Sequence, residues 1–162
     1  MIAMPLLAIF VAVLTIQLPM AANAASLSVS NLQKIAVAPD AKRIKESVEI
    51  LVGFGTRHTL SDTQSKTRGI GAARRWVEAE FNRISANCGG CLEVFTVGDN
   101  VSGDRIPNTT EVVNVIAVLR GTENPNRYVM MSGDIDSRVS DPLNAESESP
   151  GANDNASGLA GV

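Results

Sequence analysis

The chain contains little cysteine, little histidine and little excess charge, and these shortages exclude several classes of protein. Two cysteines among 162 residues are too few for a four-cysteine zinc site. The net charge is −3 and the 14 basic residues form no dense patch, so we expect no nucleic-acid partner and no electrostatic attachment to a membrane. No internal repeat is visible. The apolar fraction of 44% fits one globular domain.

The first 24 residues form a segment of their own. Residues 2–20 are almost wholly apolar and carry no charged side chain, and a small-x-small pattern, Ala22-Asn23-Ala24, follows them. We therefore predict a secretory signal peptide over residues 1–24 and a secreted or periplasmic location. An uncleaved membrane anchor is the alternative, because the run is nearly long enough to span a bilayer. Two prolines and a glutamine within the run argue against a stable anchor.

The two cysteines are close together in Cys88-Gly-Gly-Cys91. A thioredoxin-like redox motif would follow a strand and begin a helix, whereas this pair lies between a predicted helix and a predicted strand. Because an oxidising compartment favours disulfides, we predict a local disulfide that fixes a turn. Free thiols are the alternative.

Residues 25–38 are predicted to be a leader and residues 39–162 the folded domain. Apolar residues recur at helical spacing before Gly53, and again over residues 71–85. The pattern then changes to one typical of strands, at residues 92–97, 112–119 and 128–131. The last two runs are nearly continuous, which is typical of buried strands. We therefore predict an α/β domain, with a mixed β-sheet flanked by helices.

The acidic residues that follow the last predicted strand are the candidates for chemistry. Asp134 and Asp136 lie at its carboxyl end, where open α/β sheets bind ligands, and project to the same side in extended chain. If Asp154 returns to this point, three carboxylates converge and a divalent cation would relieve their repulsion. Solvated turns are the alternative for such a loop. A helix-loop-helix calcium site is a poorer match, because that pattern has Asp or Asn at the position of Arg138 and glycine directly after it.

Two motifs in this region resemble the metal-binding core of the di-zinc aminopeptidase family, which also includes glutamate carboxypeptidases and glutaminyl cyclases. The first is the apolar run that ends in Ser132-Gly-Asp-Ile-Asp-Ser137, where the family usually has Gly-His-x-Asp-Ser. The second is Pro150-Gly-Ala-Asn-Asp-Asn-Ala-Ser-Gly158, which matches almost letter for letter. The resemblance covers roughly residues 40–162. It implies a phosphorylase/hydrolase-like zinc exopeptidase fold.

The resemblance also assigns site residues. Asp154 matches the ligand that bridges two metal ions, and Asp136 matches the catalytic-site acid that orients a metal ligand. Asp134 stands where the family has a histidine ligand; a carboxylate can also bind zinc, with a shift in preference toward Mn²⁺ or Mg²⁺. The cofactors implied are two divalent metal ions, zinc first among them. The family's bridging acid precedes a cis peptide bond, so we expect one between Asp154 and Asn155.

The family's remaining site residues, a Glu-Glu pair, an Asp and a His, come later than the bridging acid. The single histidine, His58, lies far upstream in a predicted loop and is expected to be a surface or substrate-loop residue rather than a metal ligand. The chain is therefore predicted to be the N-terminal part of a secreted metallopeptidase, incomplete in its fold and inactive alone. The expected partner is a peptide or protein substrate, cut near a chain terminus. A catalytically inactive binding relative and another hydrolase or a cyclase on the same scaffold are the alternatives, and a thiol oxidoreductase is a third.

Overall fold

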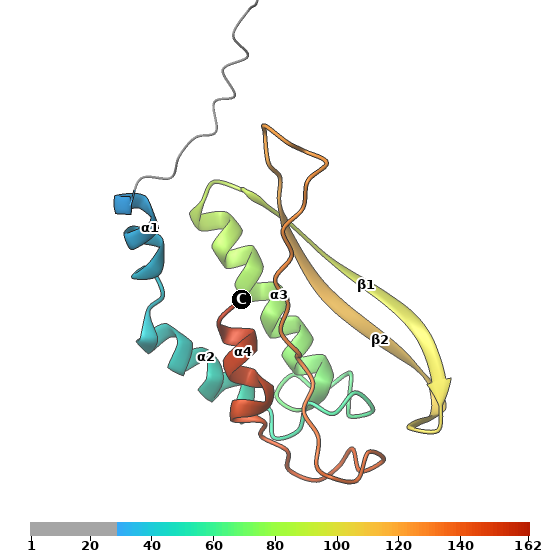
Figure 1. The fold of residues 1–162 in the computed structure, drawn as a ribbon. Coiled ribbons are helices and arrows are strands. Elements are labelled where there is room, and N and C mark those ends of the chain that lie inside the picture. The colour runs from blue at the N-terminus through green and yellow to red at the C-terminus, as the bar shows by residue number, and fades with distance from the viewer. Residues whose placement is uncertain (1–28) are drawn as a thin grey trace, which may run out of the picture.

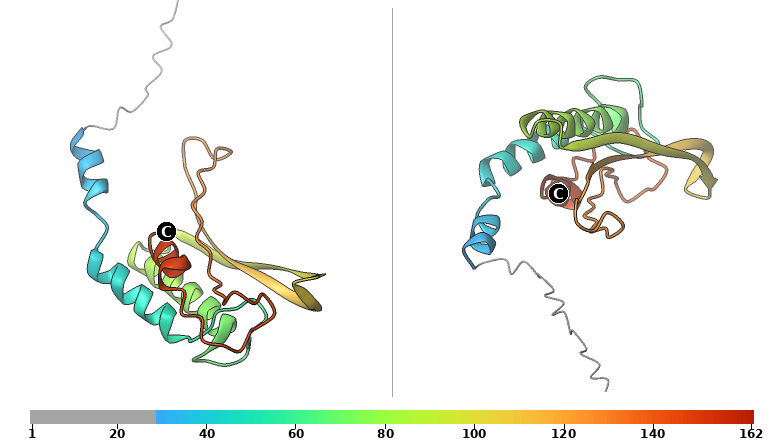
Figure 2. Two further views of the ribbon diagram at one scale, coloured as in Figure 1. Left: turned by 60° about the horizontal axis from the view of Figure 1, so that its bottom comes forward. Right: turned by 90° about the horizontal axis from the view of Figure 1, so that it is seen from above.

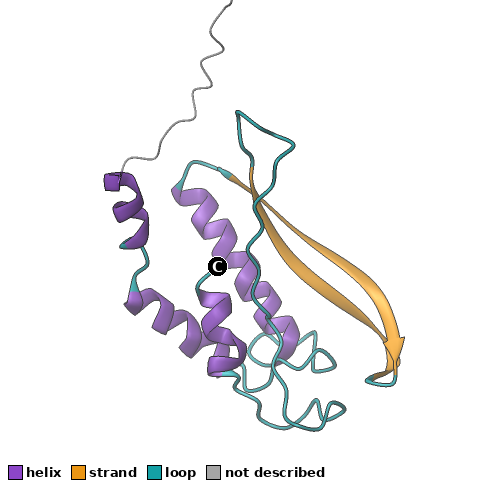
Figure 3. Cartoon of the chain, viewed as in Figure 1, coloured by secondary structure: helices purple, strands orange, loops and turns teal. Residues whose placement is uncertain are grey.

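The computed structural model describes residues 29–162, so the predicted signal peptide lies outside the described residues. Helices and a single hairpin follow one another along the chain, and residues 120–151 then run as a long irregular segment back to the helices (Figures 1 and 3). The elements are α1 (Val29–Ala36), α2 (Ala41–Gly53), α3 (Gly69–Asn87), β1 (Leu92–Gly103), β2 (Ile106–Leu119), a π-helical turn (Ala152–Ala156) and α4 (Ser157–Ala160).

Helix α2 begins and ends at residues that the sequence marks. The Asp40 side chain accepts a hydrogen bond from the Lys42 backbone N–H at 2.9 Å, which caps the first turn. The exposed face carries ion pairs between residues four apart, which add a few tenths of a kcal/mol each, ~0.2–0.5. Leu51, on the opposite face, is fully buried. The predicted helix end at Gly53 is confirmed.

Helix α3 is the longest element and packs against both strands of the hairpin, whereas α2 packs against α4 (Figure 1). Residues 69–73 at its start are all buried, and they include Gly71, where a Cβ atom would lie 2.1 Å from the Thr63 carbonyl oxygen. The helix ends at Cys88, which forms a disulfide with Cys91, as predicted. The two glycines between the cysteines have positive φ and turn the chain into β1.

Strands β1 and β2 form an antiparallel hairpin that is longer than the sequence predicted. Pairing runs from Leu92 opposite Leu119 to Gly103 opposite Ile106, with an irregularity between Val101 and Gly103. Residues 103–110, which lie between two of the predicted strands, therefore lie mostly within the hairpin. The outer end of the hairpin extends past the helices, as Figure 2 shows.

Residues 128–131 were predicted to be a buried strand, and this prediction is wrong for the described chain. They form no strand, and their side chains are 66–91% exposed. A strand needs a neighbour for its backbone hydrogen bonds, and no described strand lies beside these residues. The predicted mixed sheet is likewise a two-stranded antiparallel one within residues 29–162, with one isolated parallel bridge between Thr56 and Ser149. None of the described helices is both long and apolar enough to cross a membrane.

Candidate functional site

The two acid-bearing motifs lie against each other although they are separated along the chain. A Cβ atom on Gly133 would be 2.7 Å from the Leu159 Cα, and one on Gly151 would be 2.6 Å from the Ser137 Cβ. The segments 133–137 and 151–159 are thus in contact at both ends. Glycine is required at both points because a side chain would push the segments apart. Asp134 and Asp136 lie on one of these segments and Asp154 on the other.

A buried loop after α2 holds both segments in place. Thr56 forms the parallel bridge to Ser149, and its hydroxyl lies 3.0 Å from the Ser149 hydroxyl. The Ser137 hydroxyl accepts from the Arg57 backbone N–H at 3.1 Å and donates to the Ser149 carbonyl at 2.6 Å. All four residues are at least 94% buried. The network joins three chain segments that are far apart in sequence.

Arg57 contributes most to this network. Its side chain is 1% exposed, and its guanidinium donates to four backbone carbonyls, at distances of 2.7–3.1 Å. The acceptors are Leu51 in α2, Ile135 between the two acids, and Pro150 and Gly151 before Asp154. One cation therefore fixes both motifs to the end of α2. Burial lowers the Arg57 pKa, and the nearby Asp136 charge partly offsets this effect.

Asp136 is held by the same loop. One of its carboxylate oxygens accepts a hydrogen bond from the Thr59 hydroxyl at 3.1 Å. The Asp136 charge raises the pKa of both Arg57 and Arg74, although burial lowers both values more strongly. Asp136 is therefore half-buried between two cations and a hydroxyl donor. These neighbours hold the carboxylate in one orientation, which suits an acid that orients another group.

Asp154 occupies an irregular turn. The peptide bond between Asp154 and Asn155 is cis, which confirms the expectation from the resemblance. Asp154 and Asn155 have non-helical backbone angles although the surrounding residues form a π-helical turn. The Asn155 side-chain oxygen accepts from the Gly158 N–H at 3.1 Å, which fixes the turn to the start of α4.

The carboxylates of Asp134 and Asp154 are exposed, and no hydrogen bond within residues 29–162 engages either of them. Such free oxygen donors fit a divalent cation that accepts carboxylate ligands, Zn²⁺, Mn²⁺ or Mg²⁺. The part of the chain that the structure describes contains no group of three or more His, Cys, Asp or Glu side chains that could hold a metal ion. The predicted convergence of three carboxylates is therefore not observed. Asp136 is bonded to Thr59 instead.

His58 differs from its prediction as a surface residue. It is 5% exposed, and its Nδ1 accepts from the Leu60 N–H at 3.0 Å. Nε2 lies 3.1 Å from the Pro142 carbonyl oxygen and must carry the proton in that contact. His58 thus joins its loop to the segment around Pro142. Sequence reasoning missed this role, and that of Arg57, because neither residue belongs to a periodic pattern.

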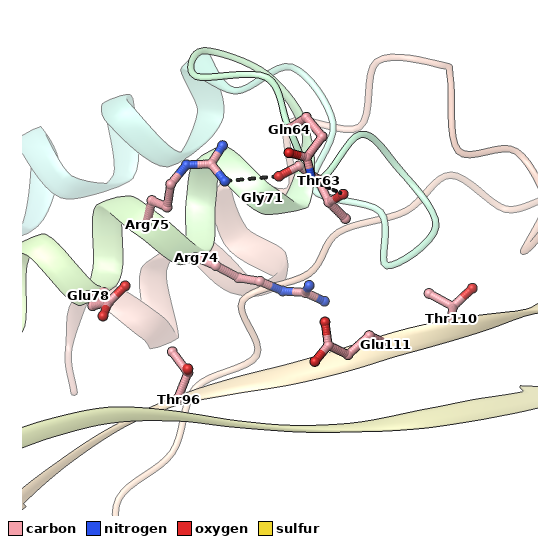
Figure 4. Close-up of a pocket in the computed structure, with 9 residues that line it drawn as sticks. All are labelled: Thr63, Gln64, Gly71, Arg74, Arg75, Glu78, Thr96, Thr110 and Glu111. Carbon is pink, nitrogen blue, oxygen red and sulfur yellow. Dashed lines mark hydrogen bonds between the residues drawn. The ribbon is translucent and has the colours of Figure 1, made fainter.

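A polar hollow of about 400 Å³ lies between α3 and the hairpin, away from Asp134 and Asp154. Figure 4 shows Arg74 reaching from α3 toward Glu111 on β2. The Arg74 Nε is buried and has no hydrogen-bond partner in the described structure. The two charges are close enough for Glu111 to raise the Arg74 pKa, against the larger effect of burial. The hollow holds no arrangement of nucleophile and base.

Comparison with known proteins points to one family. Residues 114–162 match the model of peptidase family M28. A probable zinc metalloprotease of Pyricularia oryzae is 47% identical over 138 residues, which cover 84% of this chain and 27% of that protein. Probable zinc metalloproteases of Pyrenophora teres f. teres and Leptosphaeria maculans are 48% and 46% identical over 122 residues. The chain spans about a quarter of the length of these relatives. No solved structure matches it.

Proposed function

Because residues 114–162 belong to peptidase family M28 and most of the chain is similar to fungal zinc metalloproteases, we propose that it forms part of a secreted zinc exopeptidase of the aminopeptidase type. The secreted location is inferred from the apolar segment and cleavage pattern of residues 1–24. The substrate would be a peptide or protein with a free terminus. The site would take two divalent ions.

The observation that carries the proposal is the contact between the two acid-bearing segments. It places Asp154 on one side of the contact and Asp134 on the other, both with unengaged carboxylate oxygens. These two residues would hold metal. Asp136, fixed by Thr59, would orient a neighbouring ligand rather than bind directly.

The metal would supply a polarised substrate carbonyl and a water of lowered pKa for hydrolysis. The contribution of this chain is to keep the acids in place without their rearrangement during reaction. Arg57 and Ser137 hold the segment with Asp134 and Asp136, and Arg57 also holds the residues before Asp154. A site fixed in this way needs little reorganisation in the transition state.

The proposal is tested by hydrolysis assays on the full-length protein. An aminoacyl chromogenic substrate with a free amino group is compared with the same substrate acetylated at that group. We expect cleavage of the free form alone, loss of cleavage after dialysis against a chelator, and recovery with Zn²⁺. Asp154→Asn is expected to lower kcat/KM by at least about 100-fold, the scale on which catalytic metal-site changes act. Asp104→Asn, an exposed acid at the hairpin turn, serves as the matched control.

A binding relative without catalysis is the second candidate, and one observation favours it: Asp134 stands where the family has histidine. Such a protein would bind no zinc and would cleave neither substrate.

Equal cleavage of the free and the acetylated substrate would instead reject the aminopeptidase specificity and would leave the metallopeptidase class in place.

A further inference from the structure

We propose that Asn100 and Asn108, at the outer end of the β-hairpin, are N-glycosylated, and that a third sequence of the same kind at Asn155 is not. The proposal rests on the secreted location proposed above. It concerns a modification site that has no part in the metal chemistry.

The sequence contains three Asn-x-Ser/Thr acceptor patterns. They are Asn100-Val-Ser, Asn108-Thr-Thr and Asn155-Ala-Ser, and none has proline at the middle position. Such patterns are acceptors only in proteins that enter the secretory route, and the modified residues lie on the surface. The pattern alone does not distinguish the three sites, whereas the structure does.

Asn100 and Asn108 are both exposed. No hydrogen bond within residues 29–162 engages the side-chain amide of either residue. Only backbone groups of the two residues form hydrogen bonds with side chains in the described structure. The Asn100 N–H donates to the Asp99 carboxylate, and the Asn108 carbonyl accepts from the Thr110 hydroxyl. A glycan on either amide would therefore displace no contact of the fold.

Both asparagines lie in the outer part of the hairpin. Asn100 is opposite Glu111, so their side chains share the face that looks toward α3. Thr110 is opposite Val101, and Asn108 lies between Thr110 and Ile106, in the part of β2 where the register shifts. Figure 2 shows that this end of the hairpin extends past the helices.

Asn155 is in a different environment. It is half-buried, and its side-chain oxygen accepts the Gly158 N–H. A Cβ atom on Gly158 would lie 2.1 Å from that oxygen and 2.8 Å from the amide nitrogen, so α4 closes directly over the amide. A glycan there would separate α4 from the turn that carries Asp154. A folded molecule therefore has Asn155 unmodified.

The reaction needs a lipid-diphosphate-linked oligosaccharide and the transferase of the secretory route. A bond forms between the asparagine Nδ2 and the anomeric carbon of the sugar. The bond from that carbon to the diphosphate oxygen breaks, the lipid diphosphate leaves with its electron pair, and a base of the transferase takes the amide proton. No oxidant or reductant is involved.

Glycans at these positions would also cover an exposed apolar end. Val97 is 50% exposed and Val101 36% exposed on the same hairpin. An unprotected hairpin edge can pair with other chains, and a bulky hydrated group prevents this. We therefore expect the double variant without either acceptor to be recovered from the medium in smaller amount.

The experiment expresses the full-length coding region, with its own N-terminal segment, in a fungal secretory host. Protein from the medium is treated with a peptide N-glycosidase, and tryptic peptides are searched for the conversion of asparagine to aspartate that marks each released glycan. Variants Asn100→Gln and Asn108→Gln are each expected to lose one glycan step on a gel, and both together to lose the entire shift. Asn155→Gln is the matched control and is expected to lose none.

Each outcome decides one point. Secreted protein with no shift, or with a single modified hairpin site, overturns the proposal, as does a glycan at Asn155. Absence of the protein from the medium contradicts the secreted location instead. The N-terminal segment is then replaced by a known secretory signal: two hairpin glycans support the present proposal, and their absence rejects it.

Discussion

At the scale of single residues, Arg57 is the side chain on which the candidate site depends. It is buried without a carboxylate in hydrogen-bond contact, and its donors are satisfied by backbone carbonyls from three segments. The Arg57 guanidinium therefore holds backbone segments together and does not form an ion pair through a hydrogen bond. Removing the guanidinium would leave several buried carbonyls without a donor, and each of them then retains its desolvation cost.

We predict that Arg57→Met lowers the free energy of unfolding of the full-length protein by at least about 3 kcal/mol, because charged hydrogen bonds contribute roughly 1.5–3 kcal/mol each. Arg68→Met is the matched control. Arg68 also reaches residues 146–148, through Glu148 and the Glu146 carbonyl, but its side chain is 43% exposed. Its loss should be within about 1 kcal/mol. Equal losses in denaturant unfolding would contradict the role assigned to Arg57.

Asp134 gives a second prediction at this scale. If it binds metal, Asp134→His should raise zinc retention after dialysis against a weak chelator, because imidazole suits zinc better than carboxylate does. Retention should stay unchanged in Asp104→His, where the new imidazole is on the hairpin turn. Zinc measured by mass spectrometry checks both. Unchanged retention in Asp134→His would count against Asp134 as a ligand.

The residues that sequence could assign are those inside a long motif. The expected cis bond at Asp154 is confirmed, and the two motifs do lie together. Arg57, Thr59 and His58 could not be assigned in this way, since they act through tertiary hydrogen bonds to residues about 80 positions away. A local sequence pattern does not indicate hydrogen-bond partners that are so far away in the chain.

At the scale of elements, the sequence predicted those features that depend on neighbouring residues in the chain, such as a helix end or a short disulfide. Helix α2 ends at Gly53 and α3 is joined to β1 through the Cys88–Cys91 disulfide, and both features were predicted from the sequence. Residues 128–131 show the opposite case. Their apolar pattern predicts a buried strand, but burial depends on neighbouring strands, which the described chain does not provide.

Close packing at the start of α3 gives a prediction for this scale. Gly71→Ala should destabilise the full-length protein by about 1–3 kcal/mol, because the new methyl group meets the Thr63 backbone. Gly53→Ala is the control at the end of α2, where nothing lies within 4 Å of the added Cβ. That change should be neutral or stabilising by up to about 1 kcal/mol. Melting curves with the opposite ranking would show that the α3 contact is not tight.

At the scale of the whole molecule, the described chain leaves much apolar surface in contact with water. Tyr128, Val129 and Met130 are 75–91% exposed, and Leu119 at the end of β2 is 69% exposed. Exposed apolar residues in such a contiguous run are typical of a surface that another part of a protein covers. The fully buried core is correspondingly small, with Leu51, Ile70 and Ala73 at its centre.

We therefore predict that residues 25–162 alone show no cooperative thermal transition and no peptidase activity. The reason is that the buried apolar area is too small to offset the conformational entropy of ordering the chain. Circular dichroism on heating and the aminoacyl substrate assay check the two parts. A sharp thermal transition of this segment would contradict the folding prediction. Cleavage of the substrate by this segment, lost again in its Asp154→Asn variant, would contradict the prediction that it is inactive.

The central claim, that Asp154 and Asp134 hold catalytic metal, is tested most directly by the metal content of the full-length protein. The purified wild type and Asp154→Asn are dialysed against the same metal-free buffer and measured by mass spectrometry. The account predicts two zinc ions per wild-type molecule and a loss of both in Asp154→Asn, the residue proposed to bridge them. Wild-type protein without metal above the buffer level, or a variant with unchanged zinc, would contradict it.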